Sequence, residues 1–320
     1  MTICWGITSG QAGMVAQVRA LADIMGLTPI IKNAQLCPFI AWLPNVVLAP
    51  LRPIIIPHCI DPKSEALVAP WPDIVISCGR WAAMVAMGLK AKVPATTQFI
   101  HIQDPHVDPH YFDAVVAMEH DKISGANVIK LRYALHSITP ERLQYAAQQF
   151  VPAFAAFPKP YIAVLIGGST NKYRLGYEAM RQLIEQLQQL LQMTDGSLLI
   201  TPSRRTGPAN IAMLHSVFSA NPRVYIYDLV SENPYMGMLG LADWIVVTND
   251  SVNMMSEARA SGKPVYLLPL SGHQQTKPAR FGQMLLDEGC TRLIGTTLEH
   301  WSYPAGDDTE ELVNRLSALI

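Results

Sequence analysis

Three short polar clusters in the second half of the chain each follow an apolar run that is typical of a buried strand. Paired glycines let backbone N–H groups approach an anion, arginines pair with phosphate oxygens, and a following helix adds its positive N-terminal end. The pattern therefore predicts an anion site that fits a diphosphate. Its candidate residues are Gly167, Gly168, Ser169, Thr201, Ser203, Arg204, Arg205, Thr248, Asn249, Asp250 and Ser251.

Each cluster also has an ordinary structural interpretation. The glycine pair could form a tight turn that packs a helix on a strand, and the arginines could lie on a solvated loop. Asp250 could cap a helix, although capping and ligand binding are compatible. Glu257 lies about two helical turns further on, where it could accept hydrogen bonds from ribose hydroxyls.

Acid–base groups follow the predicted strands of the first half as well. Asp104, Glu119 and His120 are the candidates for a base that takes a proton from a hydroxyl group. His120 stands between two carboxylates, which would raise its basicity. Each of the three could instead be a satisfied loop or cap residue. The histidines and aspartates of 101–110 fit no familiar metal-ligand spacing, so we expect no metal, and no cofactor.

Strand-like and helix-like segments alternate along the whole chain. Continuous apolar runs joined by helices indicate parallel sheets that are covered on both faces. We predict an α/β protein with two Rossmann-like parallel-sheet domains that face a cleft. The expected strands are 3–8, 29–32, 73–77, 97–102, 113–117, 127–130, 161–166, 197–201, 223–227, 244–248 and 264–268.

Residues 150–160 contain three prolines and show no clear period, so they are the best candidate for an inter-domain linker. We therefore expect an N-terminal, acceptor-side domain over 1–152 and a C-terminal, nucleotide-binding domain over 153–305. Residues 306–320 read as a capped helix that could pack back on the first domain.

The composition limits the classes of function. Of 320 residues, 50% are hydrophobic and 15% are charged, and the net charge is -1, which gives no general attraction to nucleic acid. The five cysteines include no CxxC pair, which is typical of a reducing compartment rather than a disulfide framework. The first residues lack a basic region and a cleavage site. These features predict a cytoplasmic protein.

Residues 36–56 are apolar, but four prolines interrupt them, which argues against a membrane-spanning helix. A peripheral contact with the inner membrane is one interpretation of this segment. Few basic residues lie nearby, which favours the other interpretation, a buried connection.

The motifs resemble known proteins in two respects. The C-terminal half is similar to the donor-binding lobe of GT-B glycosyltransferases, where a Thr/Asn-Asp-Ser turn and a helix bearing Glu hold a nucleotide-sugar. The whole chain resembles the mitochondrial-fission (ELM-type) family of bacterial and plant proteins, which is GT-B-like. The segments that carry the resemblance are 5–13, 72–80, 103–105, 112–121, 125–128, 165–169, 201–206, 232–235, 248–257 and 262–266.

The resemblance implies binding of a nucleotide-sugar. One step further, we expect a metal-independent glycosyltransferase that uses a nucleoside-diphosphate sugar, with an envelope lipid or glycan as a candidate acceptor. The resemblance also places the nucleobase near Asn233 and Tyr235. One alternative is a sugar-nucleotide epimerase on the same fold. Another is a non-catalytic interaction protein, which is favoured by Ser9 and Gln11, since the family usually carries charged residues there.

Overall fold

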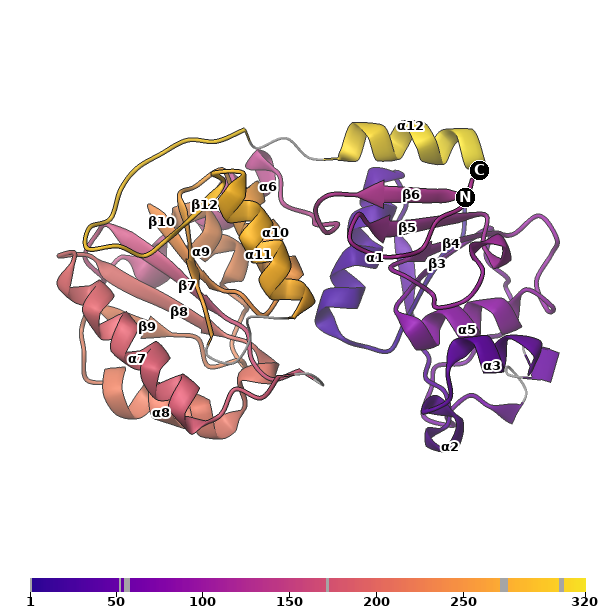
Figure 1. Ribbon diagram of the computed structural model, residues 1–320, viewed down its shortest axis with the longest axis horizontal. Helices are drawn as coiled ribbons and strands as arrows, with labels where there is room; N and C mark the ends of the chain where they lie inside the picture. Colours follow the sequence, from indigo (N-terminus) through magenta and orange to yellow (C-terminus); the bar gives the residue numbers. More distant parts are fainter. Residues whose placement is uncertain (1, 52, 55–57, 171–172, 271–275, 305–307) are drawn as a thin grey trace. The chain divides into compact units, whose positions relative to one another are not determined.

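The protein divides into two compact units, Met1–Ser137 with Asp307–Ile320 (unit 1) and Ile138–Gly306 (unit 2). Both are drawn in Figure 1. The computed structural model describes residues 2–51, 53–54, 58–170, 173–270, 276–304 and 308–320.

Unit 1 contains a six-stranded sheet in the order β2-β1-β3-β4-β5-β6, and every pair of neighbours is parallel. The central strands are apolar on both faces because helices cover both, as the continuous apolar runs predict. The strands are β1 (Cys4–Thr8), β2 (Pro29–Asn33), β3 (Ile74–Cys78), β4 (Gln98–Ile102), β5 (Ala114–Met118) and β6 (Val128–Leu131).

Two separate hydrophobic clusters cover the faces of this sheet. Helices α1 (Ala12–Ile24) and α12 (Thr309–Leu319) contribute to one cluster, and α5 (Arg80–Leu89) contributes to the other. The short helices α2 (Pro38–Ala41), α3 (Asn45–Leu48) and η1 (Ala49–Leu51) lie on the α5 side, and η2 (Pro109–Tyr111) precedes β5.

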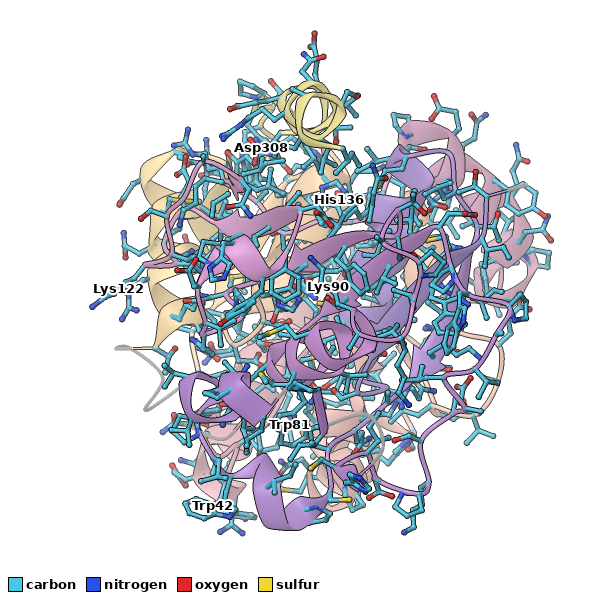
Figure 2. All side chains as sticks on the ribbon, turned by 90° about the vertical axis from the view of Figure 1, so that its right-hand side faces the viewer. Trp42, Trp81, Lys90, Lys122, His136 and Asp308 are labelled. Carbon is cyan, nitrogen blue, oxygen red and sulfur yellow. The ribbon has the colours of Figure 1, made fainter. Side chains whose placement is uncertain are left out.

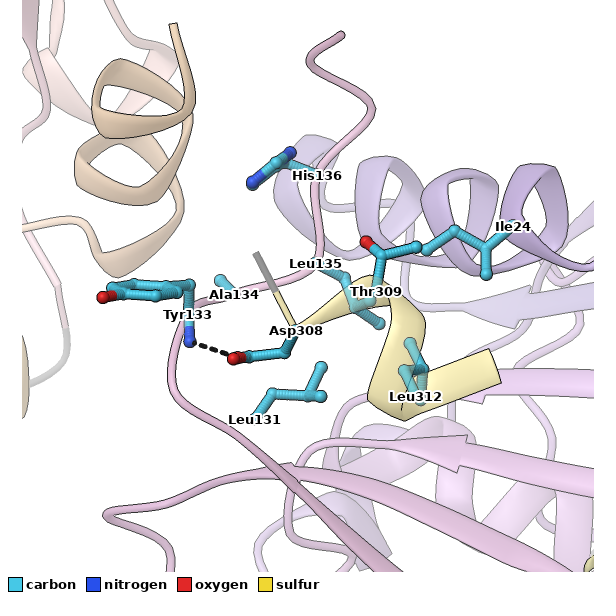
Figure 3. Close-up of a pocket in the computed structure, with 9 residues that line it drawn as sticks. All are labelled: Ile24, Leu131, Tyr133, Ala134, Leu135, His136, Asp308, Thr309 and Leu312. Carbon is cyan, nitrogen blue, oxygen red and sulfur yellow. Dashed lines mark hydrogen bonds between the residues drawn. The ribbon is translucent and has the colours of Figure 1, made fainter. Parts of the chain in front are cut away.

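Helix α12 is held on unit 1 by polar contacts as well as by its apolar face. The Asp308 carboxylate accepts hydrogen bonds from the backbone N–H groups of Arg132 at 2.6 Å and Tyr133 at 3.1 Å. Figure 3 shows the hydrogen bond from Tyr133 to Asp308 beside a small cavity that His136 and Leu312 also line. Arg315 donates to the carbonyl of Val128 at 2.9 Å. The last helix is therefore part of unit 1, although the chain reaches it from unit 2.

Unit 2 contains a second six-stranded parallel sheet in the order β12-β11-β10-β7-β8-β9. If β7 is counted as strand 1 and the sheet is read from β9 to β12, the order is 3-2-1-4-5-6. This order defines the Rossmann topology. The predicted α/β class with two Rossmann-like parallel sheets is confirmed. The strands are β7 (Tyr161–Ile166), β8 (Ser197–Pro202), β9 (Val224–Ile226), β10 (Trp244–Thr248), β11 (Val265–Leu268) and β12 (Thr291–Leu293).

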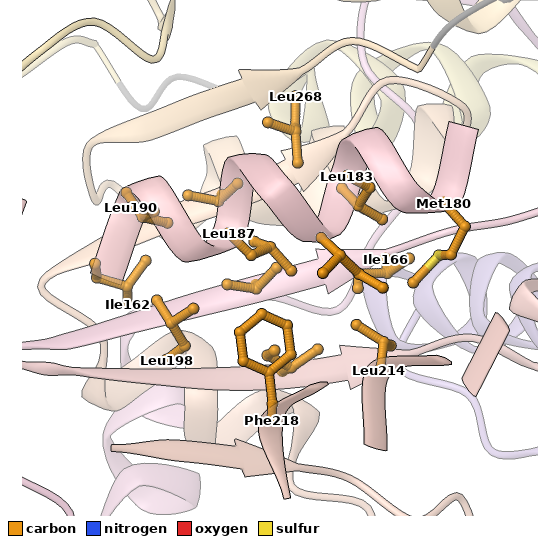
Figure 4. Close-up of a cluster of buried hydrophobic side chains, with 14 of the residues drawn as sticks. Ile162, Ile166, Met180, Leu183, Leu187, Leu190, Leu198, Leu214, Phe218 and Leu268 are labelled. Carbon is orange, nitrogen blue, oxygen red and sulfur yellow. The ribbon is translucent and has the colours of Figure 1, made fainter. Parts of the chain in front are cut away.

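Helices α7 (Tyr177–Gln192) and α8 (Pro208–Phe218) cover one face of this sheet. Leucines of α7 recur at 183, 187 and 190, so a single stripe of the helix packs on the strands (Figure 4). The remaining helices of the unit are α6 (Pro140–Phe154), α9 (Tyr235–Leu241), α10 (Val252–Ala260) and α11 (Lys277–Asp287), with the short η3 (Arg204–Thr206) after β8.

The division between the units differs from the sequence-based boundary at 152/153 by the length of α6. This helix continues through the first part of the proline-rich segment and ends at Phe154. It packs closely on α9, where a Cβ on Gly237 would lie 2.6 Å from Phe150 and one on Gly240 would lie 2.5 Å from the Leu143 carbonyl. Strand β12, at the sheet edge, was not predicted from its three residues.

The interpretation of 36–56 as a buried connection fits only part of its apolar side chains: Leu36, Leu48 and Ala49 are buried, whereas others are exposed. Trp42 is 73% exposed and Val46 is 67% exposed, and Val47, Leu51 and Ile54 are exposed as well. Figure 2 shows Trp42 at the outer margin of unit 1. We call positions 42–54, which carry these five side chains, the apolar segment. Among the helices of the described ranges, we find none that is both long and apolar enough to cross a membrane.

Candidate functional site

The carboxyl ends of β7, β8 and β10 bring the three predicted clusters of unit 2 to one place. β10 and β8 flank β7 on its two sides, so the order of the strands reverses between β7 and β10. Ligands of doubly wound sheets bind outside the strand ends at such a point. The turns that follow β7, β8 and β10 therefore lie at the same edge of the sheet.

A buried carboxylate connects the three turns. Asp250, only 2% exposed, accepts hydrogen bonds from the N–H of Gly168 at 2.7 Å and from the Thr248 hydroxyl at 2.6 Å. Arg205 Nη1 lies 3.2 Å from Asp250 Oδ2. Thr248 in turn accepts from the N–H of Gly167 at 2.8 Å. We call these contacts the Asp250 network.

This network changes the expected role of the glycines. Their N–H groups donate to the protein's own side chains, so they are not directed at a phosphate in this structure. A Cβ on Gly167 would lie 2.0 Å from Asp250 Oδ2, and one on Gly168 would lie 2.1 Å from the Arg205 backbone. The glycines allow this close approach of protein to protein.

The turn after β8 is held from both sides. Ser203 and Thr206 form a capping box around η3, and the Ser203 hydroxyl donates to the carbonyl of Gly167 at 2.9 Å. The carbonyl of Arg205 accepts from the N–H of Ser169 at 2.9 Å. Thr201 is buried inside β8. The contribution of Thr206 was missed, although the Ser-x-x-Thr spacing is a capping signal that could have indicated it.

The two arginines are held differently. The side chain of Arg205 is 39% exposed, and its guanidinium is tied to Asp250 and donates to the Gly168 carbonyl at 3.3 Å. Arg204 is exposed, and within the described residues no hydrogen bond or ion pair of its guanidinium is found. Arg205 is therefore a fixed cation, whereas Arg204 can turn toward a ligand.

The positive end of α10 lies beside the Asp250 network. Ser251 is the N-cap of this helix and accepts from the N–H of Met254 at 3.4 Å, so the cap is Ser251 and not Asp250. Asn249 accepts from the N–H of Leu270 at 3.0 Å, which joins the turn to the end of β11. A guanidinium and a helix N-terminus thus meet at one place, and both attract an anion.

Burial of the Asp250 charge also affects its surroundings. The pKa of Tyr173 is raised to about 12, first by its burial and then by the negative charge of Asp250. Two arginines and one aspartate, Arg204, Arg205 and Asp250, thus belong to the site. A phosphate group would add the negative charge that this site lacks.

Glu257 of α10 forms the second polar contact of the site. Its carboxylate accepts a hydrogen bond from the Tyr235 hydroxyl at 2.6 Å. Burial raises the pKa of Glu257 to about 7, and the Tyr235 hydrogen bond lowers it by less than that. The predicted ribose contact and the Tyr235 residue predicted for the nucleobase thus contact each other. Asn233 is exposed and accepts from the N–H of Tyr235 at 3.1 Å.

The three candidate bases lie in unit 1 after two neighbouring strands. Asp104 follows β4 and accepts from the N–H of His106 at 2.7 Å. Glu119 and His120 follow β5 directly and are exposed. Since β4 and β5 are parallel neighbours, all three residues belong to the same edge of the sheet.

The histidines of 101–110 do not gather. His101 is buried in β4, where Nδ1 lies 2.8 Å from the Ser77 hydroxyl, and burial lowers its pKa to about 3. His106 and His110 pair with Asp104 and Asp108 respectively. In the part of the chain that the structure describes, we find no group of three or more His, Cys, Asp or Glu side chains that could hold a metal.

Two solved structures share the fold of this protein over nearly the whole chain. The UDP-GlcNAc 2-epimerase from Methanocaldococcus jannaschii superimposes with a TM-score of 0.54 and 13% identity, covering 99% of this chain and 92% of that one. The Neisseria meningitidis enzyme bound to UDP-GlcNAc gives a TM-score of 0.50 and 11% identity, covering 98% and 90%. The chain therefore has the two-domain α/β fold of the GT-B type.

The family follows from the sequence comparisons. The model of the family described as Mitochondrial fission ELM1 matches residues 12–319. Mitochondrial fission protein ELM1 from Arabidopsis thaliana is 31% identical over 299 residues, which cover 85% of this chain and 69% of the relative. The chain belongs to the mitochondrial fission ELM1 family, as its motifs predicted.

The Asp250 network predicts a large difference between two glycines. Gly167→Ala places a Cβ against the buried carboxylate, so we expect the free energy of unfolding in urea to fall by about 3 kcal/mol. Gly176→Ala is the matched control, because a Cβ there meets nothing within 4 Å and φ is -83°. We expect it to cost about 1 kcal/mol or less. Equal losses in the two variants would contradict the network.

The raised pKa of Glu257 predicts a pH-dependent stability. The folded protein binds this proton more tightly than the unfolded chain, so the stabilisation is complete at pH values below about 4.5 and is lost as the pH rises through about 7. Glu257→Gln stays neutral. The free energy of unfolding of Glu257→Gln minus that of wild type should therefore be about 2 kcal/mol larger near pH 8 than near pH 5.

Urea titrations of both proteins across this pH range measure the difference. In Tyr235→Phe, which lacks the hydrogen bond to Glu257, the loss of stability with rising pH should occur at a higher pH than in wild type. A difference between Glu257→Gln and wild type that does not change with pH would show that Glu257 titrates normally.

Proposed function

We propose that unit 2 binds a nucleoside-diphosphate sugar and that the protein is a glycosyltransferase. The observation that carries this proposal is the meeting of Arg205 with the N-terminus of α10 at the point where the strand order reverses. The diphosphate would lie outside the Asp250 network, against Arg204, Arg205 and the α10 terminus. The Neisseria enzyme of similar fold was solved with UDP-GlcNAc, which supports this class of ligand.

The other contacts of the donor follow from the same geometry. Ribose hydroxyls would replace the Tyr235 hydroxyl at Glu257, since both need an acceptor of the same kind. The nucleobase would lie near Asn233, on the connection that leads into α9. Of the predicted binding residues, Gly167, Gly168, Thr201 and Thr248 would then support the site without touching the ligand.

Transfer would proceed by attack of an acceptor hydroxyl on the anomeric carbon, with departure of the nucleoside diphosphate. The arginines and the helix terminus would stabilise the charge on the departing diphosphate, a role that a metal ion fills elsewhere. A base of unit 1 would remove the hydroxyl proton. Glu119 is the strongest candidate, because no hydrogen bond to its carboxylate is found among the described residues, whereas Asp104 is engaged by His106.

A lipid-borne acceptor is favoured by the apolar segment of unit 1. Five apolar side chains between positions 42 and 54 are exposed, and exposed apolar patches mark interaction sites. Epimerisation uses no acceptor, so it gives no reason for this surface. We therefore propose a peripheral contact with a membrane. Epimerisation is the second candidate, and the similarity of the fold to epimerases supports it.

The donor proposal is tested with a panel of nucleoside diphosphates and their sugars in the presence of EDTA. We expect at least one uridine or guanosine diphosphate to raise the melting temperature and to bind in calorimetry. Arg204→Ala should weaken that binding at least about tenfold, or about 1.4 kcal/mol. Arg181→Ala, which removes an exposed arginine of the same unit, should leave it unchanged. No binding by any member of the panel would reject the proposal.

Turnover separates the three candidate activities once a donor is known. A sugar that moves to an extracted lipid supports transfer, and an isomerised donor in the absence of lipid supports epimerisation. Binding with neither product would leave an interaction protein that has kept the fold.

The membrane contact predicts co-sedimentation with vesicles of anionic phospholipid. Trp42→Ser should lower the bound fraction several-fold, because a large apolar side chain is removed from the contact. Tyr145→Ser is the control, since Tyr145 is 67% exposed but belongs to α6 of unit 2. If wild-type protein stays in the supernatant at low salt, the membrane contact is wrong.

A further inference from the structure

Two cysteines face each other at the base of the apolar segment. Leu36 and Ile60 form an antiparallel bridge, and Cys37 donates its backbone N–H to the carbonyl of Cys59 at 2.8 Å. This register places Cys37 directly opposite Cys59. Residues in such positions have their side chains on the same side, with Cα atoms about 5.5 Å apart.

The pairing meets the requirement for a disulfide. Cysteines can be joined without backbone movement when their Cα atoms are about 4.4 to 6.8 Å apart. Both residues are free thiols in this structure. The pKa of the Cys59 thiol is raised by its surroundings, first by burial and then by the negative charge of a Cys37 thiolate, which agrees with two neighbouring sulfur atoms.

The other three cysteines do not offer this chemistry. Cys4, Cys78 and Cys290 are buried. Burial raises the pKa of Cys4 to about 11 and raises the pKa of Cys78 as well. Cys59 is partly exposed, whereas Cys37 is buried. A reagent in solution therefore reaches Cys59 first.

We propose that Cys37 and Cys59 form a redox-active dithiol whose reaction partner is a low-molecular-weight disulfide such as glutathione disulfide. The Cys59 thiolate attacks one sulfur of glutathione disulfide and releases a first glutathione thiolate, which takes up the proton. The Cys37 thiolate then attacks Sγ of Cys59 and releases a second glutathione. The dithiol loses two electrons and glutathione disulfide gains them, so one protein disulfide and two glutathione molecules result.

The position of this pair gives the reaction a structural consequence. Positions 38–58 lie between the two cysteines and include the whole apolar segment. A disulfide would close that stretch into a covalent loop at its base. The reaction depends on neither nucleotide binding nor membrane binding, so its test stands apart from the proposed function.

The full-length folded protein, checked by circular dichroism, is incubated with glutathione disulfide near pH 8, quenched with acid, alkylated and digested. We expect peptide mapping by mass spectrometry to find the Cys37 and Cys59 peptides joined, with two glutathione molecules released per protein. The rate should rise about tenfold per pH unit below the pKa of Cys59, because only the thiolate reacts.

Two variants separate the steps. Cys37→Ser should stop at a mixed disulfide between Cys59 and glutathione, and Cys59→Ser should react at least about tenfold more slowly because Cys37 is buried. In wild-type protein, glutathione adducts at Cys59 without the joined peptide would overturn the proposal. Unreacted thiols at both positions, or a joined peptide that contains any other cysteine, would overturn it as well.

Discussion

The site depends on one buried carboxylate. A charge as deeply buried as that of Asp250 is tolerated only when hydrogen bonds and an opposite charge compensate for the lost water. The N–H of Gly168, the Thr248 hydroxyl and Arg205 supply that compensation, and each comes from a different strand end. Because losing any one partner would leave the charge short of compensation, the carboxylate fixes the three turns relative to each other. The glycines at 167 and 168 follow from the same constraint, since a side chain at either position would occupy the space of the network.

The network also decides which groups remain for a ligand. The backbone N–H groups after β7 are used inside the protein, whereas the guanidinium of Arg204 is exposed and that of Arg205 is partly exposed beside the N-terminus of α10. Arg205 and the helix terminus are already in place when an anion binds, whereas Arg204 would have to turn toward it. Glu257 lies on the same helix, and its partly buried carboxylate accepts a hydrogen bond from the Tyr235 hydroxyl. The proposed exchange of that donor for a ribose hydroxyl joins the two contacts into one binding surface.

Much of this arrangement could be predicted from the sequence, because apolar strands and amphipathic helices have distinct periods. All eleven predicted strands end within one residue of the observed ends of β1 to β11. The role of Asp250 could not be predicted, since a carboxylate after a strand fits a cap, a ligand contact and an internal network equally well. Only the adjacency of β7 and β10 separates these cases, and that adjacency is a property of the topology. The pairing of Cys37 with Cys59 rests on one isolated bridge, which leaves no periodic pattern in the sequence.

The most direct test of the account is a crystal structure of the protein with uridine diphosphate. The account predicts that the two phosphates lie against Arg204, Arg205 and the first turn of α10, with the hydrogen bonds of Asp250 to Gly168 and Thr248 unchanged. A diphosphate bound elsewhere would contradict it. So would a structure in which the phosphate takes the N–H of Gly168 and Asp250 has turned away from the site.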